Sequence, residues 1–216
     1  MKGIIVSNQS QANPENIKHI GIIGAGAIGQ AMAQRIVHAG LRVTLSNSRG
    51  PASLAGLVEQ LGPNAHAGSV RDAAVADIVF LSVPWQQLQS ALADVPSWDG
   101  RIVIDATNPV IQPGFRLAEL GGRNSSEVVT GLLPGARIVK AFNTLLAAVL
   151  ASDPHQAGGK RVVFLSGDDA AAKSSVGQLI ERLGFAGIDL GSLAVGGKLQ
   201  QFPGGPLPAL NLIRLG

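Results

Sequence analysis

Residues 19–29, His19-Ile20-Gly21-Ile22-Ile23-Gly24-Ala25-Gly26-Ala27-Ile28-Gly29, join a short apolar run to three spaced glycines. The β-branched run predicts a buried strand over residues 19–23, and the small residues after it predict a helix over residues 28–39. A G-x-G-x-x-G string is weak evidence alone, because a chain with 28 glycines produces such strings by chance. Here it directly follows a strand and opens a helix, which is the context of a dinucleotide-binding turn.

The rest of the chain alternates short apolar runs with helical patterns. Strands are predicted at residues 41–46, 64–67, 77–83, 101–105, 137–141 and 161–165. Helices are predicted at residues 52–61, 69–75, 85–93, 144–150 and 170–183. Such alternation is typical of βαβ units, whose sheets are mostly parallel and covered on both faces. The sequence therefore predicts an α/β fold of the Rossmann type, with a doubly wound, mostly parallel sheet and a small C-terminal extension.

The domain organisation follows from where this pattern begins and ends. Residues 1–17 are predicted to be an N-terminal extension, either a loose tail or an edge strand through residues 3–6. Residues 18–216 are predicted to form a single dinucleotide-binding domain, because no linker separates a second one. Its glycine- and proline-rich ending, residues 191–216, leaves little chain for a separate helical substrate domain.

Composition excludes several classes of protein and of site. Of the 216 residues 46% are hydrophobic and 14% are charged, which excludes a disordered chain. The absence of cysteine excludes disulfides and thiolate chemistry, and four scattered histidines give no metal-ligand spacing. The net charge of +3 comes without a Lys/Arg block, so nucleic-acid binding is not expected. With no signal-peptide pattern and no membrane-length apolar run, we expect a cytoplasmic protein that does not contact a membrane.

The glycine turn predicts how a dinucleotide is held. Gly24 suits the tight turn, Gly26 lets the main chain approach the pyrophosphate, and Gly29 allows close packing of helix and strand. The pyrophosphate then meets the positive end of the helix. The predicted binding residues of this segment are Gly24, Ala25, Gly26, Ala27, Ile28 and Gly29. The alternative is a tight strand-to-helix turn that binds no ligand.

The residues after the second predicted strand indicate which dinucleotide is bound. An enzyme that uses NAD carries an Asp or Glu here to accept from the ribose 2′-hydroxyl, whereas this chain has Ser46-Asn47-Ser48-Arg49 and no carboxylate. Hydroxyl and amide donors followed by Arg suit a 2′-phosphate. We therefore predict NADP(H) as the cofactor. The alternatives are turn or helix capping for Asn47 and Ser48, and a solvated loop cation for Arg49.

Other candidates share a position at the end of a predicted strand, where a ligand lies across the sheet of a doubly wound fold. They are Ser82, Val83, Pro84, Asn108, Pro109, Lys140, Phe142 and Asn143. Alternatives exist for three of them. Asn108 could form an Asx turn, Asn143 could cap the helix at residues 144–150, and Lys140 either extends to solvent or faces an anion.

The chain resembles the NADPH-dependent reductases of coenzyme F420, a deazaflavin, and the dinucleotide-binding enzymes grouped with them. The resemblance runs from about His19 to Leu212. It is carried by Ile22–Gly29, Ser46-Asn47-Ser48-Arg49-Gly50-Pro51, Val83-Pro84-Trp85, Asp105-Ala106-Thr107-Asn108-Pro109 and Val139-Lys140-Ala141-Phe142-Asn143-Thr144. It implies an oxidoreductase that transfers a hydride between the nicotinamide C4 of NADP(H) and the C5 of coenzyme F420. The protein then orients two cofactors without a catalytic side chain, which agrees with a sequence that offers no acid–base pair or metal cluster.

The ending of the chain bears on the electron acceptor and on assembly. Gly204-Gly205-Pro206-Leu207-Pro208 could approach a flat acceptor ring, and Leu210, Leu212 and Ile213 could pack on the core or on a second subunit, which favours a homodimer. Two alternative functions remain. The protein could reduce another acceptor with NADPH (a flavin, a quinone, or a small imine or keto compound), or it could be a non-catalytic NADP(H)-binding sensor.

Overall fold

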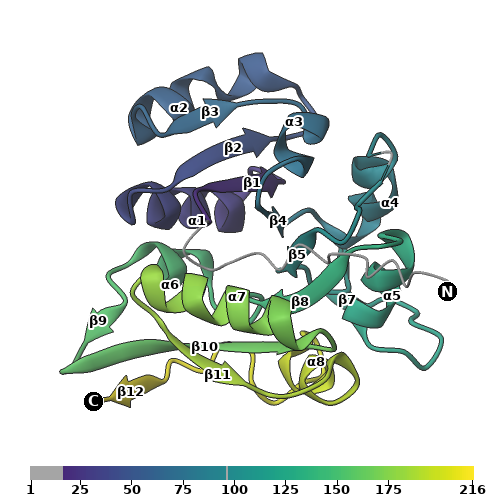
Figure 1. Ribbon diagram of the computed structural model, residues 1–216. Helices are drawn as coiled ribbons and strands as arrows, with labels where there is room; N and C mark the ends of the chain where they lie inside the picture. Colours follow the sequence, from purple (N-terminus) through teal and green to yellow (C-terminus); the bar gives the residue numbers. More distant parts are fainter. Residues whose placement is uncertain (1–16, 96) are drawn as a thin grey trace, which may run out of the picture.

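The computed structural model of the protein describes residues 17–95 and 97–216. Eight strands follow one another across the main sheet in the order β11-β10-β8-β5-β4-β1-β2-β3, seen from bottom to top in Figure 1. The edge strand considered for residues 3–6 lies outside the described residues.

Six neighbouring strands of this sheet run parallel to one another. They are β1 (His19–Ile23), β2 (Arg42–Ser46), β3 (Ala65–Ala67), β4 (Ile78–Leu81), β5 (Ile102–Asp105) and β8 (Arg137–Ala141). The order changes direction between β1 and β4, since β2 and β3 extend to one side and β4, β5 and β8 to the other. The predicted Rossmann-type, mostly parallel α/β sheet is confirmed.

The last strands of the sheet reverse direction. β10 (Gly159–Gly167) runs antiparallel to β8, and β11 (Ala186–Asp189) runs parallel to β10. Two short strands, β9 (His155–Gln156) and β12 (Ile213–Leu215), pair with the first residues of β10. Because Leu165 pairs with Ala141, the last residue of β8, the start of β10 extends past the carboxyl end of β8.

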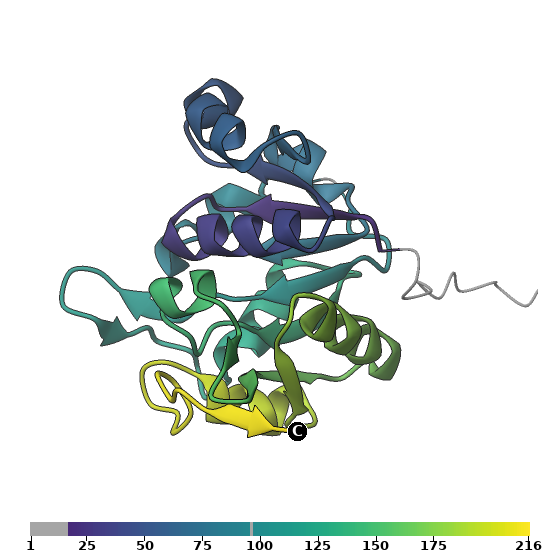
Figure 2. The same ribbon diagram turned by 90° about the vertical axis from the view of Figure 1, so that its left-hand side faces the viewer.

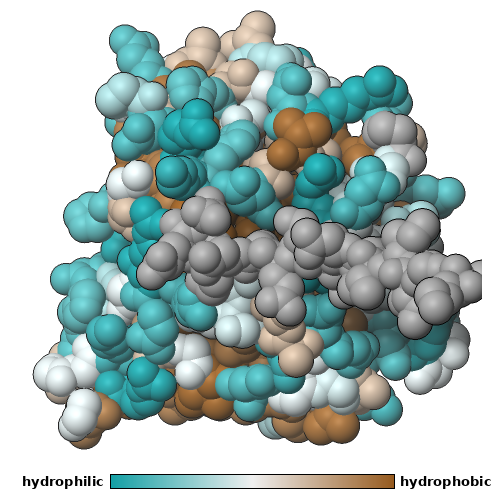
Figure 3. Space-filling view, in the orientation of Figure 1, coloured by the Kyte–Doolittle hydropathy of each residue, from teal (hydrophilic) through white to brown (hydrophobic). Residues whose placement is uncertain are grey.

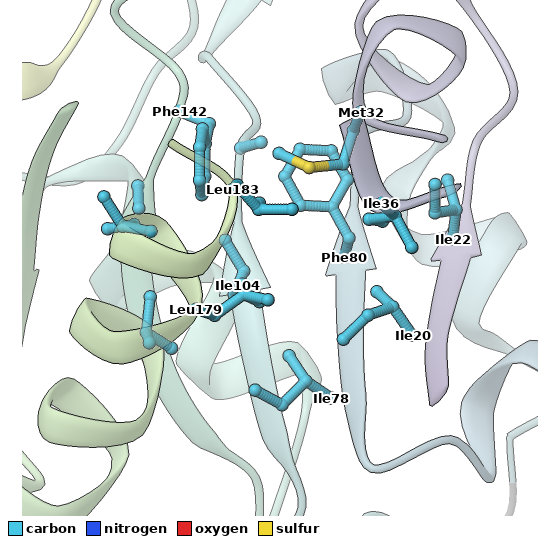
Figure 4. Close-up of a cluster of buried hydrophobic side chains, with 14 of the residues drawn as sticks. Ile20, Ile22, Met32, Ile36, Ile78, Phe80, Ile104, Phe142, Leu179 and Leu183 are labelled. Carbon is cyan, nitrogen blue, oxygen red and sulfur yellow. The ribbon is translucent and has the colours of Figure 1, made fainter. Parts of the chain in front are cut away.

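One face of the sheet is covered by α1 (Ala27–His38), α2 (Ala55–Leu61), α6 (Ala147–Ala151) and α7 (Ala170–Arg182). Figure 2 shows α1 and α7 on the side nearest the viewer. Ile78 and Phe80 of β4 point into the core beneath these helices, and Figure 4 shows them among side chains of α1 and α7. This core follows from the alternation of side chains along a strand.

The other face is covered by α3 (Val70–Ala74), α4 (Leu88–Leu92), α5 (Ser125–Leu132) and α8 (Leu193–Gln200). Val79 and Leu81, the alternate residues of β4, pack on this side. Both faces of each central strand are therefore buried. This explains why the strands appear in the sequence as continuous apolar runs rather than alternating ones.

Several elements were not predicted. They are β9, β11, β12, α5, α8 and the hairpin of β6 (Val110–Ile111) and β7 (Arg116–Leu117). α8 lies within the segment predicted as a glycine- and proline-rich extension, and its glycines obscure it. A side chain at Gly196 would collide with Ser166 and Leu190, so close packing of α8 requires glycine there.

Two predicted helices have different bounds in the structure. Residues 51–61 divide into a short 3-10 helix, η2 (Pro51–Leu54), and α2, and residues 85–92 divide into η3 (Trp85–Gln87) and α4. The helix predicted from residue 144 begins only at Ala147, because residues 142–145 form bends and turns.

The surface seen in Figure 3 is mainly hydrophilic, with apolar areas along its lower edge, where β11 and α8 lie in Figure 1. Leu210, Leu212 and Leu215 of the C-terminal segment are among the exposed large apolar residues. None of the helices in residues 17–95 and 97–216 combines the length and apolar character that crossing a bilayer requires.

Candidate functional site

A cleft lies at the carboxyl ends of β1, β2, β3 and β4, where the sheet order changes direction. Among the predicted residues, those that line it are Gly24, Ala25, Gly26, Asn47, Ser48, Arg49, Ser82, Val83 and Pro84. In doubly wound sheets ligands bind in this position. Its other lining residues are Ile23, Gly50, Pro51, Ser69, Val70, Arg71, Gln87, Ser90, Ala91 and Asp94.

The glycine turn forms the floor of the cleft. Gly24 has a φ of +104°, and a Cβ there would lie 2.5 Å from the main-chain oxygen of Ser82, so only glycine fits. A Cβ at Gly29 would collide with the main-chain oxygen of Gly24, whereas a Cβ at Gly26 would have no protein atom within 4 Å. Gly24 and Gly29 are therefore glycines because of the fold, and Gly26 faces open space.

The start of α1 is suited to an anion. Gly26 is the N-cap residue of this helix and provides no side-chain cap, and the first turn has no acidic residue. The first N–H groups of a helix lack partners within the helix, and its dipole favours negative charge there. Ala27 and Ile28 belong to this turn, so they can contribute main-chain N–H groups, although neither lines the cleft.

The loop after β2 divides its predicted residues into two groups. Ser46 is fully buried, and its hydroxyl donates to the main-chain oxygen of Ile22 over 3.0 Å. The Asn47 side chain accepts from Arg49 N–H and donates to Ser53, so it shapes the turn, as one alternative proposed. Ser48 and Arg49 are exposed on the cleft. Ser46 and Asn47 thus hold the loop, and the next two side chains face the cleft.

Lys140 requires a correction, because its side chain neither extends to solvent nor faces a ligand. It is fully buried, and Nζ lies 3.2 Å from Oδ2 of Asp105 and donates to the main-chain oxygen of Thr107 over 3.0 Å. Asp105 also accepts hydrogen bonds from Ser126 and Thr107. The anion that Lys140 faces belongs to the protein itself.

Phe142 also lies away from the cleft. Its ring is fully buried and packs edge-on against Phe80 and Phe185, with ring centroids 5.9 and 6.0 Å apart. Its side chain therefore belongs to the core, and only its main chain is left to contact a cofactor.

Asn108 and Asn143 form a cluster of amides at the carboxyl ends of β5 and β8. The Asn143 side chain donates to Asn108 Oδ1 over 2.9 Å and to the main-chain oxygen of Gln200 over 2.7 Å. Asn108 accepts in addition from the main-chain N–H of Phe202. The alternative role of Asn143 as a helix cap is wrong, because Leu146 is the N-cap residue of α6. The cluster, with the buried Pro109 beside it, holds the C-terminal segment at this edge of the sheet.

Two groups of cleft residues were missed in the sequence. One is Ser69-Val70-Arg71 at the start of α3, and the other is Gln87, Ser90, Ala91 and Asp94, in and around α4. The Ser69-x-x-Asp72 capping box marks the first group, because a helix that starts after β3 starts at the same edge of the sheet. Hydrogen bonds from the Ser69 hydroxyl and main-chain N–H hold the pKa of the Asp72 carboxyl below its ordinary value.

Among the described residues, no three His, Asp or Glu side chains gather as ligands for a metal ion. The chemistry that the cleft offers comes instead from main-chain N–H groups, hydroxyls, and the two arginines Arg49 and Arg71. This set of donors suits a ligand with phosphate groups.

Two solved structures resemble this protein closely. The hypothetical protein SMa0349 from Sinorhizobium meliloti is 48% identical, with a TM-score of 0.87, over 93% of this chain and 97% of that one. A "putative f420 dependent nadp-reductase" from Arthrobacter sp. FB24 is 28% identical, with a TM-score of 0.70, over 82% of this chain and 86% of that one.

Among curated proteins, the metalloreductase STEAP3 of Rattus norvegicus is 28% identical over 91% of this chain but only 38% of its own length. The chain thus spans about two fifths of that relative. The family model described as "NADP oxidoreductase coenzyme F420-dependent" matches residues 19–109, which include the whole cleft. Over residues 19–109 the chain therefore resembles this family of NADP oxidoreductases.

Proposed function

We propose that this protein transfers a hydride between NADP(H) and the deazaflavin coenzyme F420. The observation that carries the proposal is the cleft, in which a glycine turn at the start of α1 is joined to Ser48 and Arg49 beyond β2. The family description and the printed name of the Arthrobacter relative support coenzyme F420 as the second substrate.

In this proposal the pyrophosphate lies over Gly24, Ala25 and Gly26, and the N–H groups of Ala27 and Ile28 face it. Gly29 lets α1 pack closely enough to bring them there. The 2′-phosphate is held by Ser48 and Arg49, in a loop that Ser46 and Asn47 keep in shape. Arg is suited to this task because its planar donors match phosphate oxygens.

The nicotinamide is proposed to lie on the other side of the glycine turn, toward β4 and β5. Ser82, Val83 and Pro84 line the cleft there. The reduced nicotinamide supplies the hydride, and the protein holds the two ring systems in register and excludes water between them.

The acceptor is proposed to lie next to the amide cluster of Asn108 and Asn143. Phe202, which is 41% exposed, is held beside this cluster through its main-chain N–H. Gly205 serves the fold, since a Cβ there would lie 2.5–2.7 Å from three main-chain oxygens. Gly204, with a φ of +107° and open space around it, is the glycine that leaves room for a flat ring.

The proposal is tested by mixing the protein with NADPH and coenzyme F420 and following the absorbance of both. We expect the two signals to change together at equal rates, because one hydride leaves NADPH for each one that coenzyme F420 gains. NADH under the same conditions should be a poor donor. Rapid turnover with a flavin or quinone and none with coenzyme F420 would contradict the proposed acceptor.

A second candidate is the reduction of a different acceptor by NADPH. This candidate is favoured by the metalloreductase STEAP3, part of which is similar to this chain over 91% of the chain's length. In that case the same cleft binds NADPH, and a free flavin replaces coenzyme F420 as the hydride acceptor in the assay just described. A ferric complex added with the flavin would take one electron at a time from the reduced flavin, two ferric ions for each NADPH.

The assignment of the 2′-phosphate is tested by replacing Arg49 with alanine. NADPH binding should weaken by about 1.5–3 kcal/mol, the contribution of a hydrogen bond to a charged group, while NADH binding stays nearly unchanged. Titration of both nucleotides by calorimetry measures the difference. Equal losses for NADPH and NADH would show that Arg49 does not bind the 2′-phosphate.

The homodimer and the cytoplasmic location stay predictions. In the homodimer a second subunit would cover the exposed Leu210, Leu212 and Leu215.

A further inference from the structure

The cleft contains a second arginine, Arg71, that lies outside the motifs carrying the family resemblance. Arg71 lies in the first turn of α3, is exposed, and lines the same cleft as Arg49. The two reach the cleft from neighbouring strands, because Arg49 follows β2 and Arg71 follows β3.

The strand order indicates which part of a dinucleotide Arg71 faces. β2 and β3 lie on one side of β1, whereas β4, β5 and β8 lie on the other. With the pyrophosphate at the glycine turn after β1, one half of the ligand lies toward β2 and β3. Ser48 and Arg49 assign that half to the adenosine. The phosphate group that NADP(H) carries on this half is the 2′-phosphate.

The carboxylate beside Arg71 is already engaged. Asp72 accepts from the hydroxyl and the main-chain N–H of Ser69 over 2.7 and 2.8 Å. Within the described part of the chain no ion pair involves Arg49 or Arg71. Asp94 is the acidic residue among those lining the cleft, and it follows α4 on a different wall. Both guanidinium groups are therefore available to a ligand.

We propose that Arg71 is a second specificity-determining residue for NADP(H), which binds the 2′-phosphate together with Arg49. A phosphate monoester carries close to two negative charges at neutral pH, so two arginines match it better than one. The capping box of Ser69 and Asp72 fixes the first turn of α3, which keeps Arg71 at the cleft when it is empty. This inference rests on the proposed function only in that NADP(H) is the nucleotide.

The test compares Arg71→Ala, Arg71→Lys and Arg49→Ala with the wild type, using NADPH, NADH, 2′,5′-ADP and 5′-AMP as ligands. Arg71→Ala should weaken the binding of NADPH and 2′,5′-ADP about tenfold, because charge-assisted hydrogen bonds to phosphate are strong. The affinities for NADH and 5′-AMP should stay within about twofold of the wild type. Arg71→Lys should give an intermediate loss, because lysine keeps the charge without the planar donors. The dependence of NADPH binding on salt should also become weaker in Arg71→Ala.

Arg42→Ala is the matched control. Arg42 is exposed at the amino end of β2, the end opposite the cleft, and its loss removes the same charge from the protein. Its NADPH affinity should stay near that of the wild type. Thermal unfolding of every variant without ligand shows whether each retains the fold.

The outcomes separate this inference from the proposed function. If the wild type prefers NADPH to NADH and Arg71→Ala keeps that preference in full, the inference fails and the proposed function stands. If Arg71→Ala lowers the affinities for NADPH and NADH equally, Arg71 contacts a part that both nucleotides share. That result would also overturn the inference that Arg71 binds the 2′-phosphate. If the wild type binds NADPH and NADH alike, both proposals fail.

Discussion

Replacing Lys140 with methionine is expected to lower the free energy of unfolding by about 3–5 kcal/mol. The side chains of Lys140 and Asp105 are both fully buried and lie 3.2 Å apart. Methionine fills the space but removes the positive charge, so the Asp105 carboxylate is left buried without its counterion. Removal of one partner of a buried pair is costly for this reason, even where the intact pair stabilises little.

Urea unfolding measures the effect, and two further variants show its origin. Lys160→Met makes the same substitution in an ion pair with Glu181 whose side chains are 41% and 42% exposed. It should cost less than about 1 kcal/mol, because water screens such a pair. The double variant Asp105→Asn/Lys140→Met should recover part of the loss, since asparagine removes the uncompensated charge. An unfolding midpoint for Lys140→Met equal to that of the wild type would contradict the buried pair.

Replacing Gly29 with alanine is expected to damage both the fold and nucleotide binding. The added methyl group would collide with the main-chain oxygen of Gly24 and lie 3.0 Å from the Ser82 hydroxyl. A main-chain oxygen in a tight turn cannot move as a flexible side chain can, so α1 must shift away from β1. We expect a loss of about 1–3 kcal/mol in the free energy of unfolding, the usual cost of overpacking, and a loss of NADPH affinity of at least about tenfold.

Gly26→Ala is the matched control, because it adds the same methyl group three residues earlier. There the methyl group meets no protein atom within 4 Å, and the φ of −77° suits alanine. We expect the stability without ligand to change by less than about 0.5 kcal/mol, with NADPH binding at least about tenfold weaker. Thermal unfolding measures the stability of each variant, and NADPH titration measures its affinity for the nucleotide. If Gly29→Ala were as stable as the wild type, the close contact of α1 with the turn would be disproved.

The central strands and the cleft could be predicted because their signals are local. Residues 78–81 are apolar throughout, since both faces of β4 are covered, and the glycine turn follows its strand directly. The loop from Ser46 to Arg49 likewise lies next to the turn in space, because β1 pairs with β2. The residues that form the strand, the glycine turn and the loop are close in sequence, or they are brought together by the pairing of β1 with β2.

The other part of the candidate site could not be predicted, because its contacts join distant residues. The partner of Lys140 is Asp105, 35 residues earlier, and Asn143 donates to Gln200, 57 residues later. In the sequence, where these partners are not visible, a polar residue at the end of a strand is a candidate for contact with a ligand. Only the folded chain shows that Lys140 binds Asp105 and that Asn143 binds Asn108 and Gln200. It also shows that α8, despite its glycines, is a helix.

The cleft and the amide cluster are built from separate stretches of the chain. Every lining residue of the cleft comes from residues 23–94, whereas the amide cluster draws on residues 108, 143, 200 and 202. β10 runs from beyond the carboxyl end of β8 toward its amino end, and α8 brings the chain back, so that Gln200 lies beside Asn143. A substitution at residue 200 or 202 can therefore alter the amide cluster without changing a residue that lines the cleft.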